Sequence, residues 1–360
     1  MAGNAKMKSA SGGWFLRATL WPLWLAVLLA AAVITMACTK SETALSSSSA
    51  AAAAGKSESA AAAPVPAPAP EDNAPMPQID AKRAFEYTRQ VTAFGPRYMG
   101  NEAHKKLERY ILDHLKGDEV ESDEFTADTV EGKFPVHNII AKFPGKKDGI
   151  IAILGHYDTN YPLRNIGYVG ANDGGSSTAI LLEYANYFRE QIKKESAGGS
   201  GPKLRDGYSV WLVWTDGEEA VRTWSDTDSL YGARHLAEKW EKDGTLKKIK
   251  ALFVMDMIAA QDVNILRDDN STRWLLDLIH TAAERGGYQS HFYALETAME
   301  DDHLPFVKRG VPSADVIDMP YGYNDVYHHT AQDTMDKLDP KSLEIVGNTI
   351  LETVHLLDQR

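Results

Sequence analysis

Seven histidines and carboxylates either follow apolar runs of the chain or lie in polar loops, and their side chains are of the types that bind zinc. They are His156, Asp173, Glu218, Glu219, Asp256, His328 and His329. Protein-bound zinc takes imidazole nitrogens and carboxylate oxygens, and a catalytic zinc keeps one coordination position open. The adjacent pair Glu218 and Glu219 suits this chemistry, because one carboxylate binds metal while its neighbour moves protons. The only cysteine is Cys38, which excludes an intrachain disulfide and a thiolate metal cluster.

Taken singly, each of these residues also has a structural explanation. A lone His156 at the end of a strand is more often a hydrogen-bonded core histidine, and a histidine in a polar loop is often solvated. Glu218 and Glu219 can favour a helix dipole, and Asp173 before two glycines can cap a helix. The occurrence of the whole set in one chain favours a metal site over these separate explanations.

Short apolar runs alternate with amphipathic segments, which predicts an α/β domain. The predicted strands are 137–143, 149–154, 208–214, 251–255 and 313–317. The predicted helices are 79–91, 101–115, 177–195, 229–241, 272–285 and 340–357. Such alternation indicates a mixed, mostly parallel central sheet with helices on both faces. Active sites of these sheets gather at the carboxyl ends of the strands, so we expect the zinc-type residues to meet there.

The net charge of the 360 residues is −12. Binding to phosphates requires a surplus of Lys and Arg, so this balance argues against a nucleic-acid partner. Basic peptides or uncharged substrates are easier to accommodate. The sequence has no strong exposed apolar pattern, and we therefore expect a monomer.

The first 38 residues are predicted to be an export signal. Residues 1–17 carry three basic residues and no acid, residues 18–37 are mainly apolar, and Thr-Met-Ala precedes Cys38. This ending resembles the lipobox of bacterial lipoproteins, in which the cysteine is acylated. The alternative is a plain N-terminal membrane anchor, because the apolar run is almost long enough to span a bilayer. Both alternatives place the protein in the bacterial cell envelope, with membrane contact through its N-terminal segment only.

The composition then divides the rest of the chain in two. Residues 39–78 consist almost entirely of Ala, Ser, Pro, Glu and Lys, which predicts a disordered tether. Residues 79–360 are predicted to form the zinc-dependent catalytic domain. Inside it, the Gly- and Ser-rich stretch 195–206 reads as a mobile insertion of open role, with a place beside the site as one alternative.

In this order and context, the set resembles the zinc aminopeptidases of metallopeptidase family 28 and their relatives, the glutaminyl-peptide cyclotransferases. The resemblance covers residues 80–357 and implies a three-layer, zinc aminopeptidase-like sandwich. In the two-zinc members, His156 and Asp256 match the ligands of one metal, Glu219 and His329 match those of the other, Asp173 matches the bridge, and Glu218 matches the general base. His329, rather than His328, opens the family's His-Thr-x-x-Asp-Thr pattern. Asp158 matches an acid that orients His156.

Two segments resemble the glutaminyl cyclases more narrowly. One contains Trp224 and the run Asp-Ser-Leu-Tyr-Gly at 228–232, and the other contains Asp301. This resemblance implies one zinc on Asp173, Glu219 and His329, with Asp256 and Asp301 in an acid network around Glu218. It also implies that Trp224 and His328 line the substrate pocket. The animal cyclases carry a Trp at the position of His328. In the implied reaction, the α-amine of an N-terminal glutamine attacks its own side-chain amide, and ammonia leaves.

Two alternatives stay open at this point. In a two-zinc aminopeptidase the same residues bind both metals, and Glu218 activates a water that cleaves the first peptide bond. The sequence Gly-Ala-Asn-Asp-Gly-Gly-Ser-Ser around Asp173 is closer to this form. In a catalytically inactive binding lipoprotein, a metal ligand or Glu218 would be missing, and this chain has them all. Peptide or protein N-termini are the expected substrates of both enzymes.

Overall fold

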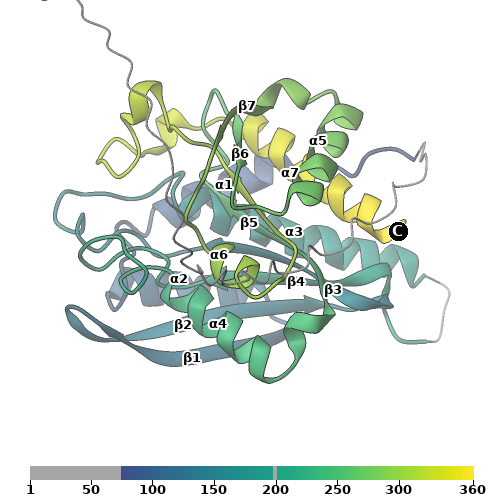
Figure 1. The fold of residues 1–360 in the computed structure, drawn as a ribbon, viewed down its shortest axis with the longest axis horizontal. Helices are drawn as coiled ribbons and strands as arrows, with labels where there is room; N and C mark the ends of the chain where they lie inside the picture. The colour runs from purple at the N-terminus through teal and green to yellow at the C-terminus, as the bar shows by residue number, and fades with distance from the viewer. Residues whose placement is uncertain (1–73, 198–200) are drawn as a thin grey trace, which may run out of the picture. The chain divides into compact units, whose positions relative to one another are not determined.

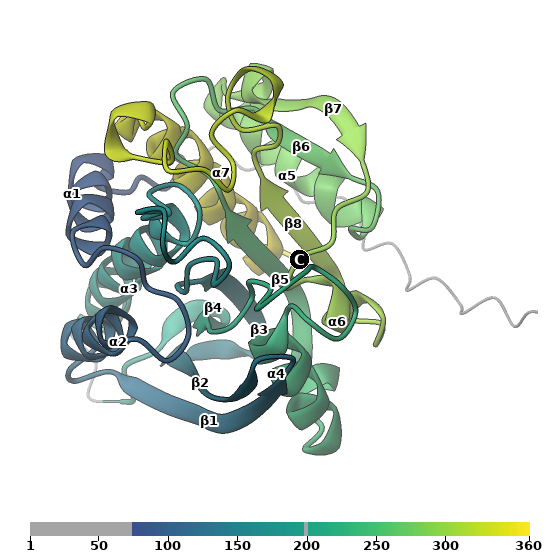
Figure 2. The same ribbon diagram turned by 90° about the vertical axis from the view of Figure 1, so that its left-hand side faces the viewer.

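A six-stranded mixed sheet forms the centre of the protein, which was studied as a computed structural model that describes residues 74–197 and 201–360. Its strands lie in the order β1-β2-β4-β3-β5-β8 (Figures 1 and 2). They are β1 (Glu119–Thr129), β2 (Gly132–Phe143), β3 (Gly145–His156), β4 (Arg205–Thr215), β5 (Ile249–Asp256) and β8 (Ser313–Ile317). The four strands from β4 to β8 are parallel, whereas β1 and β2 add an antiparallel edge. A separate parallel pair joins β6 (Ile265–Asp268) to β7 (Phe292–Thr297).

Helices cover both faces of this sheet (Figure 2). They are α1 (Ala81–Thr92), α2 (Glu102–His114), α3 (Gly175–Glu195), α4 (Tyr231–Lys242), α5 (Arg273–Gly286), α6 (Leu304–Val307) and α7 (Pro340–Asp358). Successive side chains of β3 point to opposite faces, as a strand requires. Ile151 and Ile153 belong to the core under α3 and α7, whereas Ala152 and Leu154 belong to the core under α4. The predicted three-layer α/β sandwich is confirmed.

Local chemistry explains where several helices begin. The side chains of Asp80, Asn101 and Asp339 accept backbone N–H groups in the first turns of α1, α2 and α7. α3 begins differently, after Gly174 in the left-handed region at φ 71°. A Cβ at Gly174 would lie 2.6 Å from the carbonyl oxygen of Asp158, so only glycine allows the start of α3 to approach the end of β3.

All five predicted strands and all six predicted helices are present, but three strands and one short α-helix were not predicted. β1 is a polar edge strand, so the apolar runs that mark a buried strand are absent from it. β6, β7 and α6 have only four to six residues each. The helices of the described residues include none long and apolar enough to cross a membrane.

The described residues of the stretch 195–206 do not lie beside the site. Glu195 ends α3 and Arg205 begins β4, where Arg205 pairs with Gly145 at the start of β3. His156 is at the other end of that strand. Twelve strand residues at about 3.3 Å each separate the two ends by on the order of 35 Å.

The predicted signal or anchor at 1–38 and most of the tether at 39–78 lie outside the described residues. At the end of the tether, Gln78 accepts a hydrogen bond from the side chain of Asn348 on α7 at 3.1 Å. The first residue of the predicted catalytic domain, Ile79, donates its backbone N–H to the same side chain at 2.8 Å. The chain therefore already packs against the domain at residue 78.

Candidate metal centre and active site

The zinc-type residues meet at the carboxyl ends of the parallel strands, as expected. His156 ends β3 opposite Thr215 at the end of β4, and Asp256 ends β5. Glu218 and Glu219 lie in the loop after β4. Together these segments surround a cavity of about 330 Å³, which is lined by Asp173, Glu218, Glu219, Trp224, Asp256, Met257, Met299, Glu300, Asp301, Ile317, Met319, His328 and His329.

A first cluster forms around His156. Its Nε2 lies 3.1 Å from Asp173 Oδ1 and 3.1 Å from Asp256 Oδ1. Its Nδ1 faces Asp158 Oδ1 at 3.6 Å and Glu218 Oε2 at 3.8 Å. All five side chains are buried. The position of Asp158 is the one from which an acid orients the ring of a metal-binding histidine.

A second cluster forms around His329. Its Nε2 lies 3.2 Å from Glu219 Oε1 and 3.4 Å from Asp173 Oδ2. Asp173 therefore turns one carboxylate oxygen to each histidine and connects the two clusters. The neighbouring His328 ring lies 4.0 Å from that of His329, and its Nδ1 is 3.1 Å from Asp325 Oδ2.

The donor atoms of both clusters fit zinc. Each cluster sets two carboxylate oxygens around one imidazole nitrogen, which is a mixed nitrogen and oxygen set of the kind zinc takes. None of the residues that line the cavity is Lys or Arg. A cation held between the imidazole and the carboxylates would compensate this concentration of buried negative charge. His328 offers a further nitrogen, which lies within 4.8 Å of donor atoms on Asp173 and His329.

Three buried residues that the sequence did not single out hold these ligands in place. Asn160 donates its side-chain N–H to Glu219 Oε2 at 2.7 Å, and the Tyr168 hydroxyl donates to Asp173 Oδ2. Asp333 accepts the backbone N–H groups of Asn172 and Asp173 at 2.9 and 3.1 Å. Asp333 belongs to the His-Thr-x-x-Asp-Thr segment that begins at His329, so that pattern was the available signal for it. Asn160 and Tyr168 had no comparable signal.

Burial and neighbouring charges separate the acidities of the carboxyl groups. Burial opposes the ionisation of Asp173, but His156 and His329 outweigh it and hold its pKa well below the usual range. Burial raises the pKa of Glu218 well above its usual value, with His156 opposing and Glu219 adding to the shift. Such a separation suits a site in which Asp173 is an ionised ligand and Glu218 a proton carrier.

The acids deeper in the cavity are shifted in the same direction as Glu218. Burial and the charge of Asp256 raise the pKa of Asp301 to about 6. Burial also raises the pKa of Asp256, with His156 opposing. Asp301 lines the same cavity as Glu218, and it also begins the turn before α6, where its carbonyl oxygen accepts the Leu304 N–H at 2.9 Å. The structure therefore places Asp301 in the cavity with Glu218.

Trp224 forms part of the cavity wall. Its indole Nε1 donates to Glu300 Oε2 at 3.0 Å, and this contact connects the loop after β4 to the loop before α6. Of the nine predicted site residues, eight line the cavity, and His156 contacts two of those eight. The tertiary structure thus brings the whole predicted set together.

Comparisons with known proteins agree with this site. The model of peptidase family M28 matches residues 138–354. A glutaminyl-peptide cyclotransferase of Drosophila melanogaster is 31% identical over 267 residues, which cover 68% of this chain and 72% of the relative.

Solved structures show the same fold. A glutaminyl cyclase from an Acidobacteriales bacterium is 48% identical, with a TM-score of 0.75 over 81% of this chain and 98% of that one. A zinc-dependent exopeptidase from Parabacteroides distasonis shares the fold at 24% identity, with a TM-score of 0.66 over 78% of this chain and 99% of that one. The chain belongs to peptidase family M28 and, within it, to the glutaminyl-peptide cyclotransferases.

Proposed function

We propose that this chain is a zinc-dependent glutaminyl-peptide cyclotransferase that converts the N-terminal glutamine of peptides to pyroglutamate and releases ammonia. The observation that carries the proposal is the shared cavity of about 330 Å³, in which Trp224 and Asp301 lie with Glu218 and the zinc-type ligands. The 48% identity to a solved bacterial glutaminyl cyclase supports it.

Asp173, Glu219 and His329 would hold the zinc of the cyclase. Zinc bound there supplies a Lewis acid that polarises the side-chain amide carbonyl of the substrate glutamine. Asn160 fixes the orientation of Glu219, and Tyr168 fixes that of Asp173. Such supporting hydrogen bonds hold the carboxylates of metal ligands in position.

Glu218 acts as the proton carrier of the reaction. The α-amine nitrogen of the substrate forms a bond to the side-chain amide carbon, and the bond from that carbon to the amide nitrogen breaks. Glu218 takes a proton from the attacking amine and delivers it to the leaving nitrogen, which departs as ammonia. A carboxyl whose pKa is raised by burial is suited to both transfers.

The other cavity residues orient the reacting groups. Asp256 and Asp301 hold Glu218 within a group of buried acids, while Trp224 and His328 form walls against which the glutamine side chain packs. Both reacting groups belong to one molecule, so catalysis depends mainly on folding the substrate into a reactive conformation.

A two-zinc aminopeptidase is the second candidate, and one observation favours it. His156 Nε2 lies 3.1 Å from both Asp173 and Asp256, so the protein offers a second complete set of metal ligands. In that case Asp256 is a ligand, and Glu218 activates the water that cleaves the first peptide bond.

The two candidates predict different products. The purified protein, loaded with zinc, is incubated with Gln-Phe-Ala and with Leu-Phe-Ala, and the products are identified by mass spectrometry. Loss of ammonia from the glutamine peptide, with the leucine peptide intact, supports the cyclotransferase. Release of free leucine refutes it and supports the aminopeptidase.

We further propose that the enzyme is exported to the bacterial cell envelope and held there through Cys38 or the apolar segment before it. The support is the sequence of residues 1–38. Incorporation of labelled fatty acid by the wild type and not by Cys38→Ala would identify the lipid anchor. Incorporation by neither protein would leave the apolar segment as the anchor.

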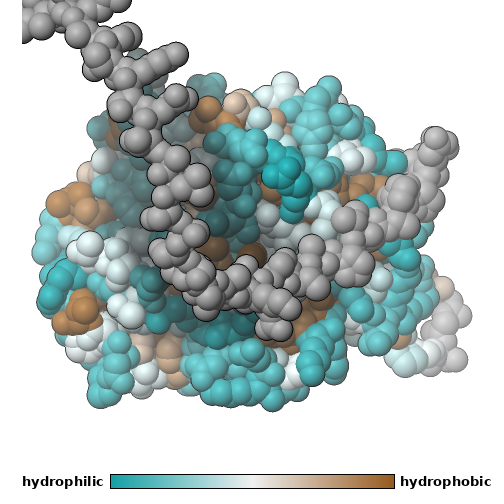
Figure 3. All heavy atoms as spheres, viewed as in Figure 1, coloured by the Kyte–Doolittle hydropathy of each residue, from teal (hydrophilic) through white to brown (hydrophobic). Residues whose placement is uncertain are grey.

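We also propose that the enzyme is a monomer. On the face seen in Figure 3, hydrophilic residues cover most of the visible surface and hydrophobic ones form separate spots. Light scattering of the purified protein measures the mass directly. A mass of twice that of one chain would refute this proposal.

A further inference from the structure

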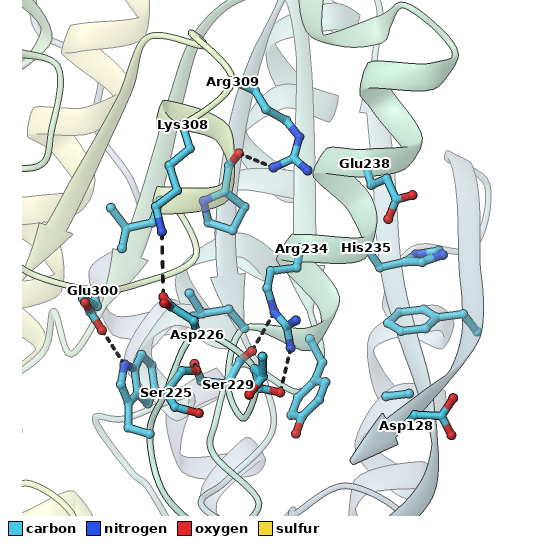
Figure 4. A pocket seen from close by; sticks show the side chains of 18 of the residues that line it. Asp128, Ser225, Asp226, Ser229, Arg234, His235, Glu238, Glu300, Lys308 and Arg309 are labelled. Carbon is cyan, nitrogen blue, oxygen red and sulfur yellow. Dashed lines mark hydrogen bonds and ion pairs between the residues drawn. The ribbon is translucent and has the colours of Figure 1, made fainter. Parts of the chain in front are cut away.

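A second and larger cavity adjoins the candidate active site. Its volume is about 580 Å³. β1, the loop 224–231, the first turns of α4 and the α6 segment form its walls (Figure 4). Trp224 and Glu300 line this cavity as well as the catalytic one. We call the larger cavity the outer groove.

The shared wall gives the outer groove a direct relation to the substrate. The catalytic cavity ends at the metal ligands on the carboxyl edge of the sheet, so a peptide whose first residue binds there must leave on another side. Trp224 and Glu300 stand between that cavity and the outer groove. An extended chain advances about 3.3–3.6 Å per residue, so the next three residues cover about 10 Å. A peptide that leaves along the shared wall of Trp224 and Glu300 would enter the groove with these residues.

The acidic residues of the groove are largely committed to partners. Asp128 pairs with Lys133, Glu238 pairs with Lys242, and Glu300 accepts from the Trp224 indole. Asp226 has only Lys308, at 4.0 Å, and is 90% exposed. Lysines thus neutralise Asp128 and Glu238, whereas Glu300 and Asp226 keep most of their charge.

Two of its basic residues have no close ion pair. The Arg234 guanidinium donates to the backbone carbonyls of Ser229 at 3.0 Å and Thr227 at 3.3 Å, and it lies over the Tyr231 ring. No carboxylate of the described residues forms an ion pair with it. Lys308 is 65% exposed and has only the distant contact with Asp226. In Figure 4, Arg234 extends from α4 toward Ser229, and Lys308 extends toward Asp226. By contrast, Arg309 is paired with Glu241 at 3.0 Å.

We infer that the outer groove binds the residues that follow the N-terminal glutamine of a peptide substrate, and that Arg234 and Lys308 select a carboxylate there. This inference rests on the proposed cyclotransferase activity. Carboxylates are the complement of a guanidinium without an ion pair among the described residues and of an ammonium group whose acidic contact is 4.0 Å away. Two sources supply this chemistry, namely Asp or Glu side chains at positions two to four and the C-terminal carboxylate of a short peptide.

The test compares kcat/KM for matched peptides with the zinc-loaded, full-length enzyme. Gln-Ala-Glu-Glu-amide and Gln-Ala-Gln-Gln-amide differ only in side-chain charge, and Gln-Ala-Gln-Gln with a free carboxylate provides the second source. Exposed ion pairs contribute little each, so we expect the two cations together to give a preference of roughly 2- to 10-fold for the charged peptides. The preference shrinks at 1 M salt, where surface charges are screened.

Two variants assign the preference to its residues. Arg234→Gln lowers the ratio of kcat/KM for the acidic and the neutral peptide toward one. Lys308→Glu, at an exposed position that does not endanger folding, brings the ratio below one. The ratio is taken within one variant, so a general loss of activity from a disturbed loop does not alter it. Lys247→Glu is the matched control, because Lys247 is exposed next to the start of β5, away from both cavities.

The outcomes separate this inference from the function on which it rests. Equal rates for acidic and neutral peptides, or a ratio that neither variant changes, would overturn the role of the outer groove while the cyclotransferase activity stands. Absence of pyroglutamate from every peptide would overturn the proposed function and this inference with it. A preference for the peptide acid but not for the glutamate side chains would place the C-terminal carboxylate in the groove.

Discussion

Replacing Asp333 with alanine tests whether this residue holds the metal centre together. Asp333 is fully buried and touches no proposed metal position. Its carboxylate accepts the backbone N–H groups of Asn172 and Asp173 and, at 3.1 Å, the hydroxyl of Tyr321. It therefore connects the loop that carries His329 to the loop that carries Asp173, which lies 160 residues earlier.

The size of the effect follows from these three bonds. Alanine leaves two N–H donors and one O–H donor buried without an acceptor, at about 1 kcal/mol or more each. We expect the free energy of unfolding to fall by about 3 kcal/mol. Residues that support metal ligands typically contribute 10- to 100-fold in metal affinity, and we expect a loss in that range because Asp173 is no longer held.

The assays are thermal unfolding of the metal-free protein and zinc affinity by competition with a chromophoric chelator. Unfolding is measured at pH 4, where the pKa of Asp333, raised by burial to about 7, costs no stability, and zinc affinity is measured at pH 8. Asp333→Asn keeps the shape and one acceptor oxygen, and it should fall between alanine and the wild type. Asp336→Ala, an exposed change nearby in the chain, is the control and should alter neither quantity. Wild-type zinc affinity in the alanine variant would refute the reasoning.

Three further predictions follow from the site and its surroundings. Glu218→Gln removes the proton carrier and should lower kcat by about 10²- to 10⁴-fold without loss of bound zinc. If that variant loses both its bound zinc and its activity, Glu218 is instead a metal ligand. Removal of zinc by a chelator should abolish cyclisation, and added zinc should restore it. Metal analysis of the restored enzyme then gives one zinc ion per chain for the cyclotransferase or two for the aminopeptidase. Activity that persists after the zinc is removed would contradict a zinc enzyme. Burial raises the pKa of Asp318 to about 7, which lies above its value in the unfolded chain. The Asp318 carboxyl therefore lowers the free energy of unfolding increasingly as the pH rises from about 4 to 7. Asp318→Asn, which keeps an oxygen for the Asn264 N–H, should therefore raise the melting temperature at pH 8 but not at pH 4, and an equal shift at both values would show that charge is not the cause.

Elements with a strong local pattern were predictable from the sequence. The strand 149–154 is a continuous apolar run because helices cover both of its faces, and it lies within β3. β1, by contrast, has no continuous apolar run. It is an edge strand with only two buried residues, so its pairing with β2 leaves no apolar pattern in the sequence.

The candidate ligands were predictable for a different reason. Zinc requires particular side-chain types, and the strand ends that carry His156 and Asp256 can be recognised from the apolar runs before them. The resemblance to metallopeptidase family 28 then indicated which of these residues would bind the same metal ion. The number of metal ions does not follow from the residue types, because both proposed arrangements use the same side chains.

The sequence by itself determined the positions of the strands and helices with a strong apolar pattern and the types of side chain at the strand ends, since both depend on residues close together in the chain. Only the tertiary structure decided which distant residues support the ligands. Asn160 reaches Glu219 across 59 residues, and Asp333 reaches Asn172 across 161. It also brought Trp224 and Glu300 together between two cavities and directed the Arg234 guanidinium to backbone carbonyls. Such pairings arise from the packing of loops at one edge of the sheet, and no local periodicity records them.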